Sequence, residues 1–276
     1  MSGRVVTGRA VSSGVYTSRA QQKAAGALRE FGRMWALALD VAVGIVRRPF
    51  QVREFLQQFW FIASVSITPA ILVSVPFGAV ISLQLGALTT QIGASQFNGG
   101  ASVLAVIQQA SPIVTTLVVA GAGGSAICAD LGSRTIREEI EAMQVLGVSP
   151  VHRLVVPRVL AAMLAAVLLN GLVSVVGVIG GYFFNVIVQG GTPGAYLASF
   201  NALAQVPDLL VSTIKALIFG FLAGIVAAYR GLHPRGGPKG VGDSVNQSVV
   251  ITFLLLFFVN TLITALYLKI VPAKGL

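Results

Sequence analysis

The feature that most constrains this chain is the absence of charge over long stretches. Residues 55–129, 159–207 and 244–268 contain no Asp, Glu, Lys or Arg residue. A helix needs about 20 mostly apolar residues to cross the hydrocarbon core of a bilayer. Only 10% of the 276 residues are charged, against about a quarter in a soluble domain. The chain is therefore expected to be an all-α integral membrane protein.

The apolar segments predict five membrane spans, preceded by a region of different character. Residues 1–26 are rich in Ser, Gly and Arg and are expected to form a basic disordered tail. Residues 27–58 are apolar but interrupted by charges, which is typical of amphipathic helices that lie in the headgroup region. The five spans fall within residues 59–270, at 59–88, 103–128, 156–188, 207–229 and 249–268.

The distribution of basic residues predicts the orientation of these spans. The segment before the first span holds nine Lys or Arg residues, residues 130–158 hold four and residues 230–243 hold three, which is 16 of the 19 in the chain. Residues 89–102 and 189–206 hold none. Because cytoplasmic loops carry an excess of Lys and Arg, we expect a multi-pass protein of the cell (inner) membrane with a cytoplasmic N-terminus and an extracytoplasmic C-terminus. The net charge of +10 is then a topology signal, and nucleic acid is not an expected partner.

The most polar part of the chain lies between the second and third spans and holds four of the nine acidic residues. Ile136, Ile140 and Met143 recur there at helical spacing and give one apolar face. Gly147 suits the left-handed residue that closes a helix. The pattern predicts a short amphipathic helix over about 133–148 on the cytoplasmic face, joined without slack to both spans. A solvated connecting helix is the alternative interpretation.

A longer motif surrounds this helix. Residues 120–161, AGAGGSAICADLGSRTIREEIEAMQVLGVSPVHRLVVPRVLA, resemble the signature segment of the MlaE/YrbE permease family, whose members are membrane subunits of ABC transporters that move lipids alongside MCE proteins. The family's Glu-Leu-Gly, Glu-Glu-Ile-Asp-Ala-Leu, Gly-Val-x-Pro and Pro-Arg elements are matched at residues 130–132, 138–143, 147–150 and 157–158. Residues 214–231 and 240–250 also resemble the family, so the resemblance covers about residues 28–270.

The resemblance implies a five-span permease domain over residues 59–270, in which the polar helix is the coupling helix that docks into a nucleotide-binding subunit. The residues assigned to this coupling are Arg137, Glu138, Glu139, Glu141, Met143 and Leu146. The chain contains no Gly-x-x-x-x-Gly-Lys-Ser/Thr motif, so it is not expected to be an enzyme, and ATP and Mg²⁺ belong to a separate ATPase dimer. We expect no catalytic residue, cofactor or metal site on this chain.

Two departures from the family pattern bear on the partners. Ala122 stands where many members carry Arg, and residues 244–246 read Ser-Val-Asn where Ala-Thr-Thr is usual. The missing Arg favours a YrbE permease of an actinobacterial Mce system, in which two different permeases pair. A heterodimer with a second YrbE-type permease is therefore expected, and a homodimer stays open. The resemblance further implies a hexamer of MCE proteins and a lipid substrate as partners.

The lipid path implied by the resemblance runs along the first span and includes a lysine of the fourth. Its candidate residues are Phe77, Val80, Leu83, Gln84, Leu88 and Lys215. A lysine inside a span is a functional-site hypothesis by default. Two interpretations stay open: Lys215 lines the path and meets an acidic headgroup, or it pairs with Asp208, about two turns earlier, as a structural contact. Gln84 and Gln108 are equally compatible with interhelical hydrogen bonds, which is the favoured interpretation for each taken singly.

Two other classes of protein lack the residues they need. An ion-coupled secondary transporter, the alternative function, normally places carboxylates or histidines near the bilayer midplane. Here Asp208 lies near a span end, and no other acidic residue lies within a span. A membrane enzyme needs clustered histidines and carboxylates that face one cavity. Fatty acids, mycolic acids, sterols and phospholipids all stay open as substrates, as does the direction of transport.

Overall fold

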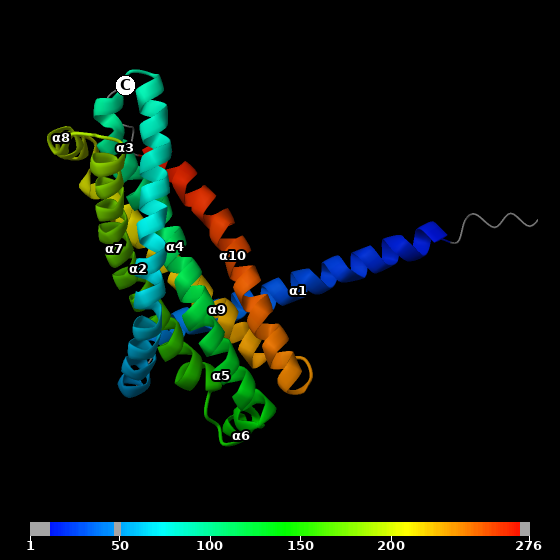
Figure 1. Cartoon of the computed structure of the whole chain (residues 1–276). Coiled ribbons are helices and arrows are strands. Elements are labelled where there is room, and N and C mark those ends of the chain that lie inside the picture. Colours follow the sequence, from blue (N-terminus) through cyan, green and yellow to red (C-terminus); the bar gives the residue numbers. More distant parts are fainter. Residues whose placement is uncertain (1–11, 47–50, 271–276) are drawn as a thin grey trace, which may run out of the picture.

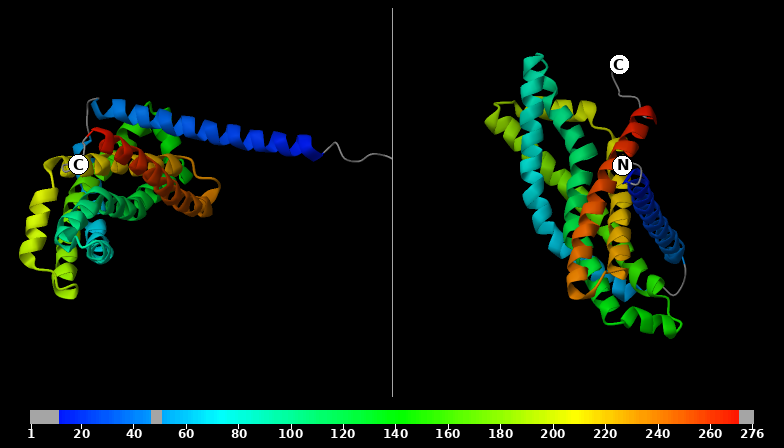
Figure 2. Two further views of the ribbon diagram at one scale, coloured as in Figure 1. Left: turned by 90° about the horizontal axis from the view of Figure 1, so that it is seen from above. Right: turned by 90° about the vertical axis from the view of Figure 1, so that its right-hand side faces the viewer.

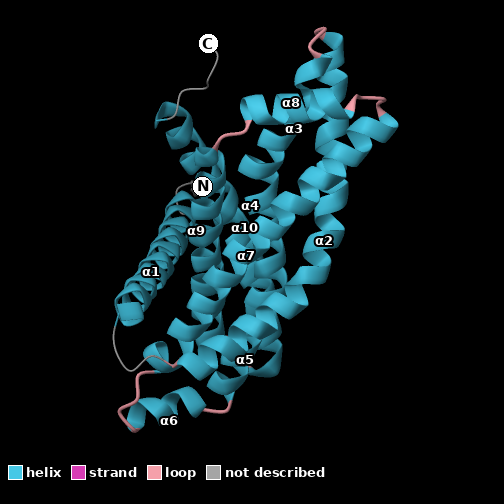
Figure 3. Ribbon diagram, turned by 90° about the vertical axis from the view of Figure 1, so that its left-hand side faces the viewer, coloured by secondary structure: helices cyan, strands magenta, loops and turns pink. Residues whose placement is uncertain are grey.

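The computed structural model describes residues 12–46 and 51–270, and every regular element in these ranges is a helix (Figures 1 and 3). Within these ranges, five helical segments are long and apolar enough to cross a membrane: Val52–Gln91, Ser95–Ile136, Val151–Val188, Val206–Leu232 and Gly237–Tyr267. The prediction of an all-α membrane protein with five spans is confirmed. Every span is longer than the sequence pattern suggested, because polar residues at the span ends continue the helices.

Several of these segments are divided by short 3₁₀ or π turns, which are labelled η. The order along the chain is α1 (Ser12–Val46), α2 (Val52–Gln91), η1 (Ser95–Phe97), α3 (Asn98–Ala105), η2 (Val106–Ala110), α4 (Ser111–Val118), η3 (Val119–Gly124), α5 (Ser125–Ile136), α6 (Glu139–Val145), η4 (Val151–Val155), α7 (Val156–Phe183), η5 (Phe184–Val188), α8 (Pro193–Leu203), α9 (Val206–Leu232) and α10 (Gly237–Ile270).

The bundle is built around α7, whose buried face is rich in Ala and Gly and packs against α2 and α9. Small residues let membrane helices approach closely. A Cβ atom at Gly78 of α2 would lie 2.1 Å from the backbone oxygen of Gly177 in α7, and one at Gly220 of α9 would lie 2.8 Å from the Cβ of Ala166. Glycine at these positions therefore allows α2, α7 and α9 to pack as one unit.

The second span contains two π turns. The first, η2, carries Gln108 and Gln109, and the second, η3, is the glycine-rich run VAGAGG. A Cβ at Gly123 would lie 2.9 Å from the side chain of Ile62 in α2, so glycine at this position of η3 allows the two spans to approach closely. π turns leave backbone carbonyls without their regular partner and are frequent at functional sites. Gln108 in η2 is therefore a candidate site residue.

The two ends of the bundle carry different short helices. α6 lies at one end, and α8 lies at the other, beside α3 (Figure 1). The absence of charge in residues 189–206 predicted a loop there and not α8. Its start is nevertheless a regular one: the Thr192 hydroxyl accepts a hydrogen bond from the backbone N–H of Ala195 at 3.4 Å, and Pro193 occupies the first turn.

The N-terminal region differs from its prediction. α1 begins at Ser12, so residues 12–26, expected within a disordered tail, are helical; residues 1–11 lie outside the described residues. α2 begins at Val52, so residues 52–58, expected at the interface, form the first turns of the first span. The charge of Glu54 is accommodated there because its carboxylate lies 3.0 Å from the guanidinium of Arg158.

α1 projects away from the bundle (Figures 1 and 2). Leu37 and Val41 are buried against the spans, whereas Phe31, Trp35 and Leu39 are exposed. An exposed row of apolar side chains suits the headgroup region of a membrane. The interfacial position of α1 stays a prediction.

Candidate functional site

The polar segment between the second and third spans forms two helices, whereas one was predicted over about 133–148. α5 ends at Ile136 and α6 begins at Glu139. Between them Glu138 adopts a left-handed backbone conformation, with φ 61° and ψ 13°. It is the one non-glycine residue with positive φ in the described part of the chain. Such a conformation is uncommon for a residue with a Cβ, so the break was not predicted. It lets α6 turn off the line of α5 (Figure 3).

α6 packs one side on the bundle and exposes the other. Ile140 is buried and Met143 packs against the same core, as the helical spacing predicted, and Gly147 closes the helix with φ 74°. Ile136, assigned to the same face, is 37% exposed, and that assignment is wrong because the helix breaks after it. The predicted coupling residues that are exposed are Arg137, Glu138, Glu141 and Leu146. Val145, which the sequence analysis missed, is 88% exposed beside them.

A fully buried arginine, Arg158 of α7, lies at the same end of the bundle. One terminal nitrogen of its guanidinium lies 2.6 Å from Oδ2 of Asp130 in α5 and 3.0 Å from Oε1 of Glu54 in α2. The other donates to the backbone oxygen of Leu154 at 2.8 Å. A buried charge is tolerated when it is paired in this way. Arg158 belongs to the Pro-Arg element of the family motif but was not among the predicted site residues. The signal that points to it is a lone cation in an apolar run.

Further ion pairs lead from Asp130 into α6. Nε of Arg134 lies 3.1 Å from Oδ1 of Asp130, and Nη1 of Arg134 lies 3.7 Å from Oε2 of Glu139. Nε of Arg137 lies 2.9 Å from Oε1 of Glu139. Glu139, a predicted coupling residue, is therefore engaged by two arginines of this chain.

A second buried cation, Lys215, lies in the α8-side half of α9. It is 1% exposed, and its Nζ donates to the backbone oxygen of Gln108 at 2.9 Å and to Oγ1 of Thr264 at 2.8 Å. Oδ1 of Asp208 accepts from Nε2 of Gln108 at 2.7 Å and from the hydroxyl of Tyr267 at 2.5 Å. Among the described residues Asp208 and Lys215 form no direct ion pair, so the pair considered from sequence is wrong. The π turn η2 inserts Gln108 between them, and Gln108 binds both.

The predicted lipid-path residues of the first span lie on its outer surface. Phe77, Val80, Gln84 and Leu88 are exposed, and Leu83 is half-buried. α2 and α10 are the two spans least enclosed by the rest of the chain, with 28% and 17% of their most apolar segments buried. Lys215 is enclosed and is not part of this surface. The structure therefore separates the lysine from the five residues with which it was grouped.

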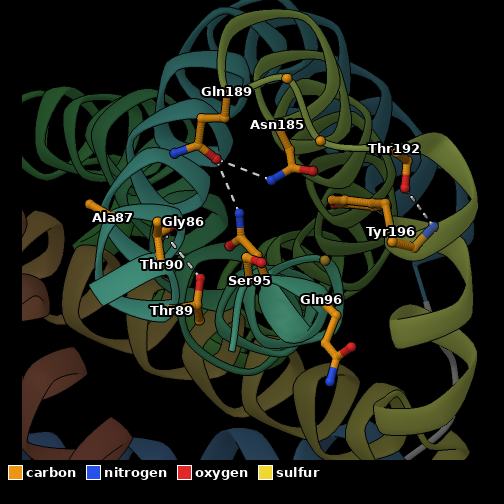
Figure 4. Close-up of a pocket in the computed structure, with 15 residues that line it drawn as sticks. Gly86, Ala87, Thr89, Thr90, Ser95, Gln96, Asn185, Gln189, Thr192 and Tyr196 are labelled. Carbon is orange, nitrogen blue, oxygen red and sulfur yellow. Dashed lines mark hydrogen bonds between the residues drawn. The ribbon is translucent and has the colours of Figure 1, made fainter. Parts of the chain in front are cut away.

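A polar cavity of about 680 Å³ opens at the α8 end, between the end of α2, the start of α3, η5 and α8. The side chain of Gln189 links three segments that line the cavity (Figure 4). Oε1 of Gln189 accepts hydrogen bonds from Nδ2 of Asn98 and of Asn185, both at 3.1 Å. Nε2 of Gln189 donates to the backbone oxygen of Leu83 at 3.1 Å. Burial raises the pKa of the Tyr196 hydroxyl, in the same wall, to about 12, so it is neutral. The described lining residues include no charged side chain and no aliphatic one larger than alanine. Such walls suit water or neutral polar groups rather than acyl chains.

Comparison with known proteins assigns this bundle to a family. The sequence matches the family described as Permease MlaE over residues 55–266, from α2 into α10. It is 31% identical over 231 residues to a probable ABC transporter permease protein of Rickettsia conorii, covering 82% of this chain and 87% of the relative. A probable ABC transporter permease protein of Synechocystis sp. is 31% identical over 221 residues, covering 80% and 84% of the two chains. Protein TRIGALACTOSYLDIACYLGLYCEROL 1, chloroplastic, of Arabidopsis thaliana is 28% identical over 233 residues, covering 84% and 67%.

The matched region includes the polar segment with α6, both buried cations and the cavity at the α8 end. It extends over all five spans except the first turn of α2 and the last residues of α10. The ion-coupled secondary transporter considered from sequence is therefore set aside. The chain belongs to the MlaE permease family and is the permease of an ABC transporter, not itself an enzyme.

Proposed function

We propose that this permease moves lipids across or out of the cell membrane, driven by a separate ATPase dimer and together with MCE proteins. The observation that carries the proposal is the match to Permease MlaE over residues 55–266. The Arabidopsis relative bears a name built on that of a galactolipid, trigalactosyldiacylglycerol, which supports a lipid as the substrate class. Fatty acids, mycolic acids, sterols and phospholipids all fit the proposal.

The exposed surfaces of α2 and α10 support both a lipid path and a second permease. Apolar side chains gather on the open side of α10: Leu254, Phe257, Phe258, Leu262 and Leu266 are all more than half exposed. With Phe77, Val80 and Leu88 of α2 they give large apolar areas that either lipid or a partner must cover. A second YrbE-type permease, packed across part of this surface, would enclose a lipid between two chains. A heterodimer is favoured because Ala122 stands where many members carry Arg.

α6 is the proposed coupling helix. It is seven residues long and is separated from α5 by two residues. It exposes Glu141, and Leu146 is exposed directly after its end. A short helix held between two spans transmits a displacement better than a slack loop. The basic residues around it support a cytoplasmic position, where it meets the ATPase, while α8 and the polar cavity then face outward toward the MCE hexamer.

The decisive experiment is purification of the chain from its native membrane, with co-purifying subunits and lipids identified by mass spectrometry. We expect an ATPase, a second permease and an MCE protein, together with a bound lipid. The reconstituted complex should transfer that lipid between vesicles only when ATP is hydrolysed. Two results would refute ATP-driven lipid transport. One is an assembly that contains no ATPase, and the other is ATP hydrolysis that lipid does not stimulate and that transfers no lipid.

A further inference from the structure

The ion pairs at the α6 end form one continuous path between the first span and the proposed coupling helix. The path starts at Glu54 in the first turn of α2, passes through Arg158 of α7 to Asp130 of α5, and continues through Arg134 to Glu139, the first residue of α6. Its links measure 3.0, 2.6, 3.1 and 3.7 Å in that order. Ion pairs therefore join side chains of four helices, α2, α5, α6 and α7, which also pack together in one hydrophobic core.

Arg158 is the member of the path that holds the others in place. Its guanidinium is 0% exposed, whereas the side chains of Glu54 and Asp130 are 30% and 38% exposed. A buried guanidinium cannot turn to water, so it must keep its carboxylates. Its planar fork also binds more than one acceptor at fixed angles, which a lysine ammonium does not do.

The short backbone connection between α5 and α6 allows a movement of α6 to reach these ion pairs. α5 and α6 are separated by two residues, and Glu138 holds a left-handed conformation between them. A displacement of α6 therefore reaches the end of α5, where Arg134 and Asp130 lie on consecutive turns. Because Asp130 and Glu54 share one nitrogen of Arg158, movement of Asp130 forces either movement of Glu54 or loss of an ion pair.

We propose that Arg158 is a positioning residue that couples α6 to the start of α2. Displacement of α6 by an ATPase would thus be delivered to the first span, whose outer surface carries Phe77, Val80 and Leu88. The exposed pairs of Arg134 and Glu139 add little energy by themselves. Their role is to orient α6 relative to the buried triad of Arg158, Glu54 and Asp130. This inference rests on the proposed function for its consequence in transport, but the mechanical link can be measured without an ATPase.

The first measurement is made on the permease alone in nanodiscs. Spin labels on cysteines at the exposed positions Gln57 of α2 and Gln144 of α6, with Cys128→Ala, report the distance between the two elements. We expect a narrow distribution in the parent protein and a broad one in Glu54→Gln and in Asp130→Asn, each of which leaves Arg158 one carboxylate. Arg230→Gln is the matched control, because Arg230 lies at the same end but pairs with Glu30 of α1, off the path.

The second measurement is the amount of lipid transferred per ATP hydrolysed by the complete complex. A coupling contribution of ordinary size predicts a ratio about 5-fold lower, or more, in Glu54→Gln and Asp130→Asn. Arg158→Lys should lower it as well while keeping the positive charge, and Arg230→Gln should not. Assembly and basal ATP hydrolysis should stay near normal in all of them, which a purely structural role would not produce.

The outcomes separate the two proposals. Unchanged distances and unchanged lipid per ATP in the triad variants would overturn the role of Arg158, as would an equal effect of Arg230→Gln. Loss of assembly in every triad variant would overturn it too, since the triad would then serve the fold alone. If the parent complex transfers no lipid but the distances respond as expected, lipid transport fails and the mechanical link stands.

Discussion

Arg158 and Lys215 are both enclosed almost completely, yet the fold balances their charges in different ways. Arg158 lies within 3.0 Å of two carboxylates at the α6 end. Lys215 lies within 2.9 Å of two neutral oxygens, from Gln108 and Thr264, in the other half of the bundle. The carboxylate of Asp208 is connected to Lys215 only through Gln108. One cation is therefore paired with charge and the other only with dipoles.

The difference indicates what each site can do. Ion pairs in a low-dielectric environment are strong and hold a fixed geometry. A lysine ammonium has three N–H donors, of which the described contacts of Lys215 use two. An incoming anionic group could replace a neutral oxygen there and gain a full charge interaction, whereas at Arg158 it would compete with two carboxylates. Arg158 is therefore suited to holding helices together, and Lys215 to an exchange of partners.

The largest expected effect comes from removing both anions of Arg158. In Glu54→Gln with Asp130→Asn the buried guanidinium keeps its charge without any carboxylate, which should cost about 3–5 kcal/mol of stability. Arg158→Met should cost less, because the carboxylates left behind are 30% and 38% exposed and water can solvate them. Thermal unfolding and the yield of monodisperse protein in detergent measure both. The opposite order would show that burial of Arg158 is not what makes the triad strong.

Removal of the second cation should have a smaller structural effect and a clearer functional one. Lys215→Met removes two hydrogen bonds, which destabilises the protein, but it also removes a buried charge, which partly offsets that loss. We therefore expect about 1–2 kcal/mol of destabilisation, with assembly retained. Uptake of labelled lipid should fall if an acidic group exchanges onto Lys215. Thr213→Val, an exposed change on the same helix, is the control. Loss of assembly would instead make Lys215 a structural contact, and normal uptake would show that no acidic group of the lipid exchanges onto it.

Exposed charges on α6 should affect docking and leave the fold intact. Charge reversal in Glu138→Lys with Glu141→Lys removes contacts to an ATPase worth under about 1 kcal/mol each in solvent, and more in a groove that partly desolvates them. We expect weaker ATPase retention in detergent pull-downs, with lower ATP hydrolysis and lipid transfer. Arg153→Glu, in η4 after α6, should do much less. Normal retention and transport in the double variant would return α6 to a solvated connector.

The sequence predicted what depends on local pattern and failed where distant residues meet. Five spans follow from composition, and the buried side of α6 follows from the spacing of Ile140 and Met143. The partners of Arg158 come from residues 104 and 28 positions earlier in the chain, Glu54 and Asp130, which no periodicity connects. Asp208 and Lys215 were a candidate pair because they lie about two turns apart on the same helix. The pairing failed because Gln108 of another helix occupies the space between them.

Two local features were missed for different reasons. The start of α8 carried an ordinary signal, Thr192 followed by Pro193, which a closer look at capping would have found. The break before α6 carried none, because Glu138 is not a residue that favours the left-handed region. The left-handed conformation of Glu138 occurs together with the packing of Ile140 against the core of the bundle, and the helix propensities of single residues do not describe such tertiary contacts.

The smallest expected effect comes from a site in which one carboxylate lies between two arginines, whereas at Arg158 one arginine lies between two carboxylates. Glu30 of α1 lies between two arginines, with Oε2 3.4 Å from Arg230 and Oε1 2.8 Å from Arg235, but the side chain of Arg235 is 88% exposed. Solvent screens such pairs, so Glu30→Gln should change stability by less than about 0.5 kcal/mol. Unfolding midpoints should therefore rank Glu30→Gln far below the double variant of Glu54 and Asp130, and added salt should shrink the Glu30 effect first. A Glu30 effect as large as that of the double variant would mean that the number of ion pairs, rather than the burial of Arg158, sets the stability of this end of the bundle.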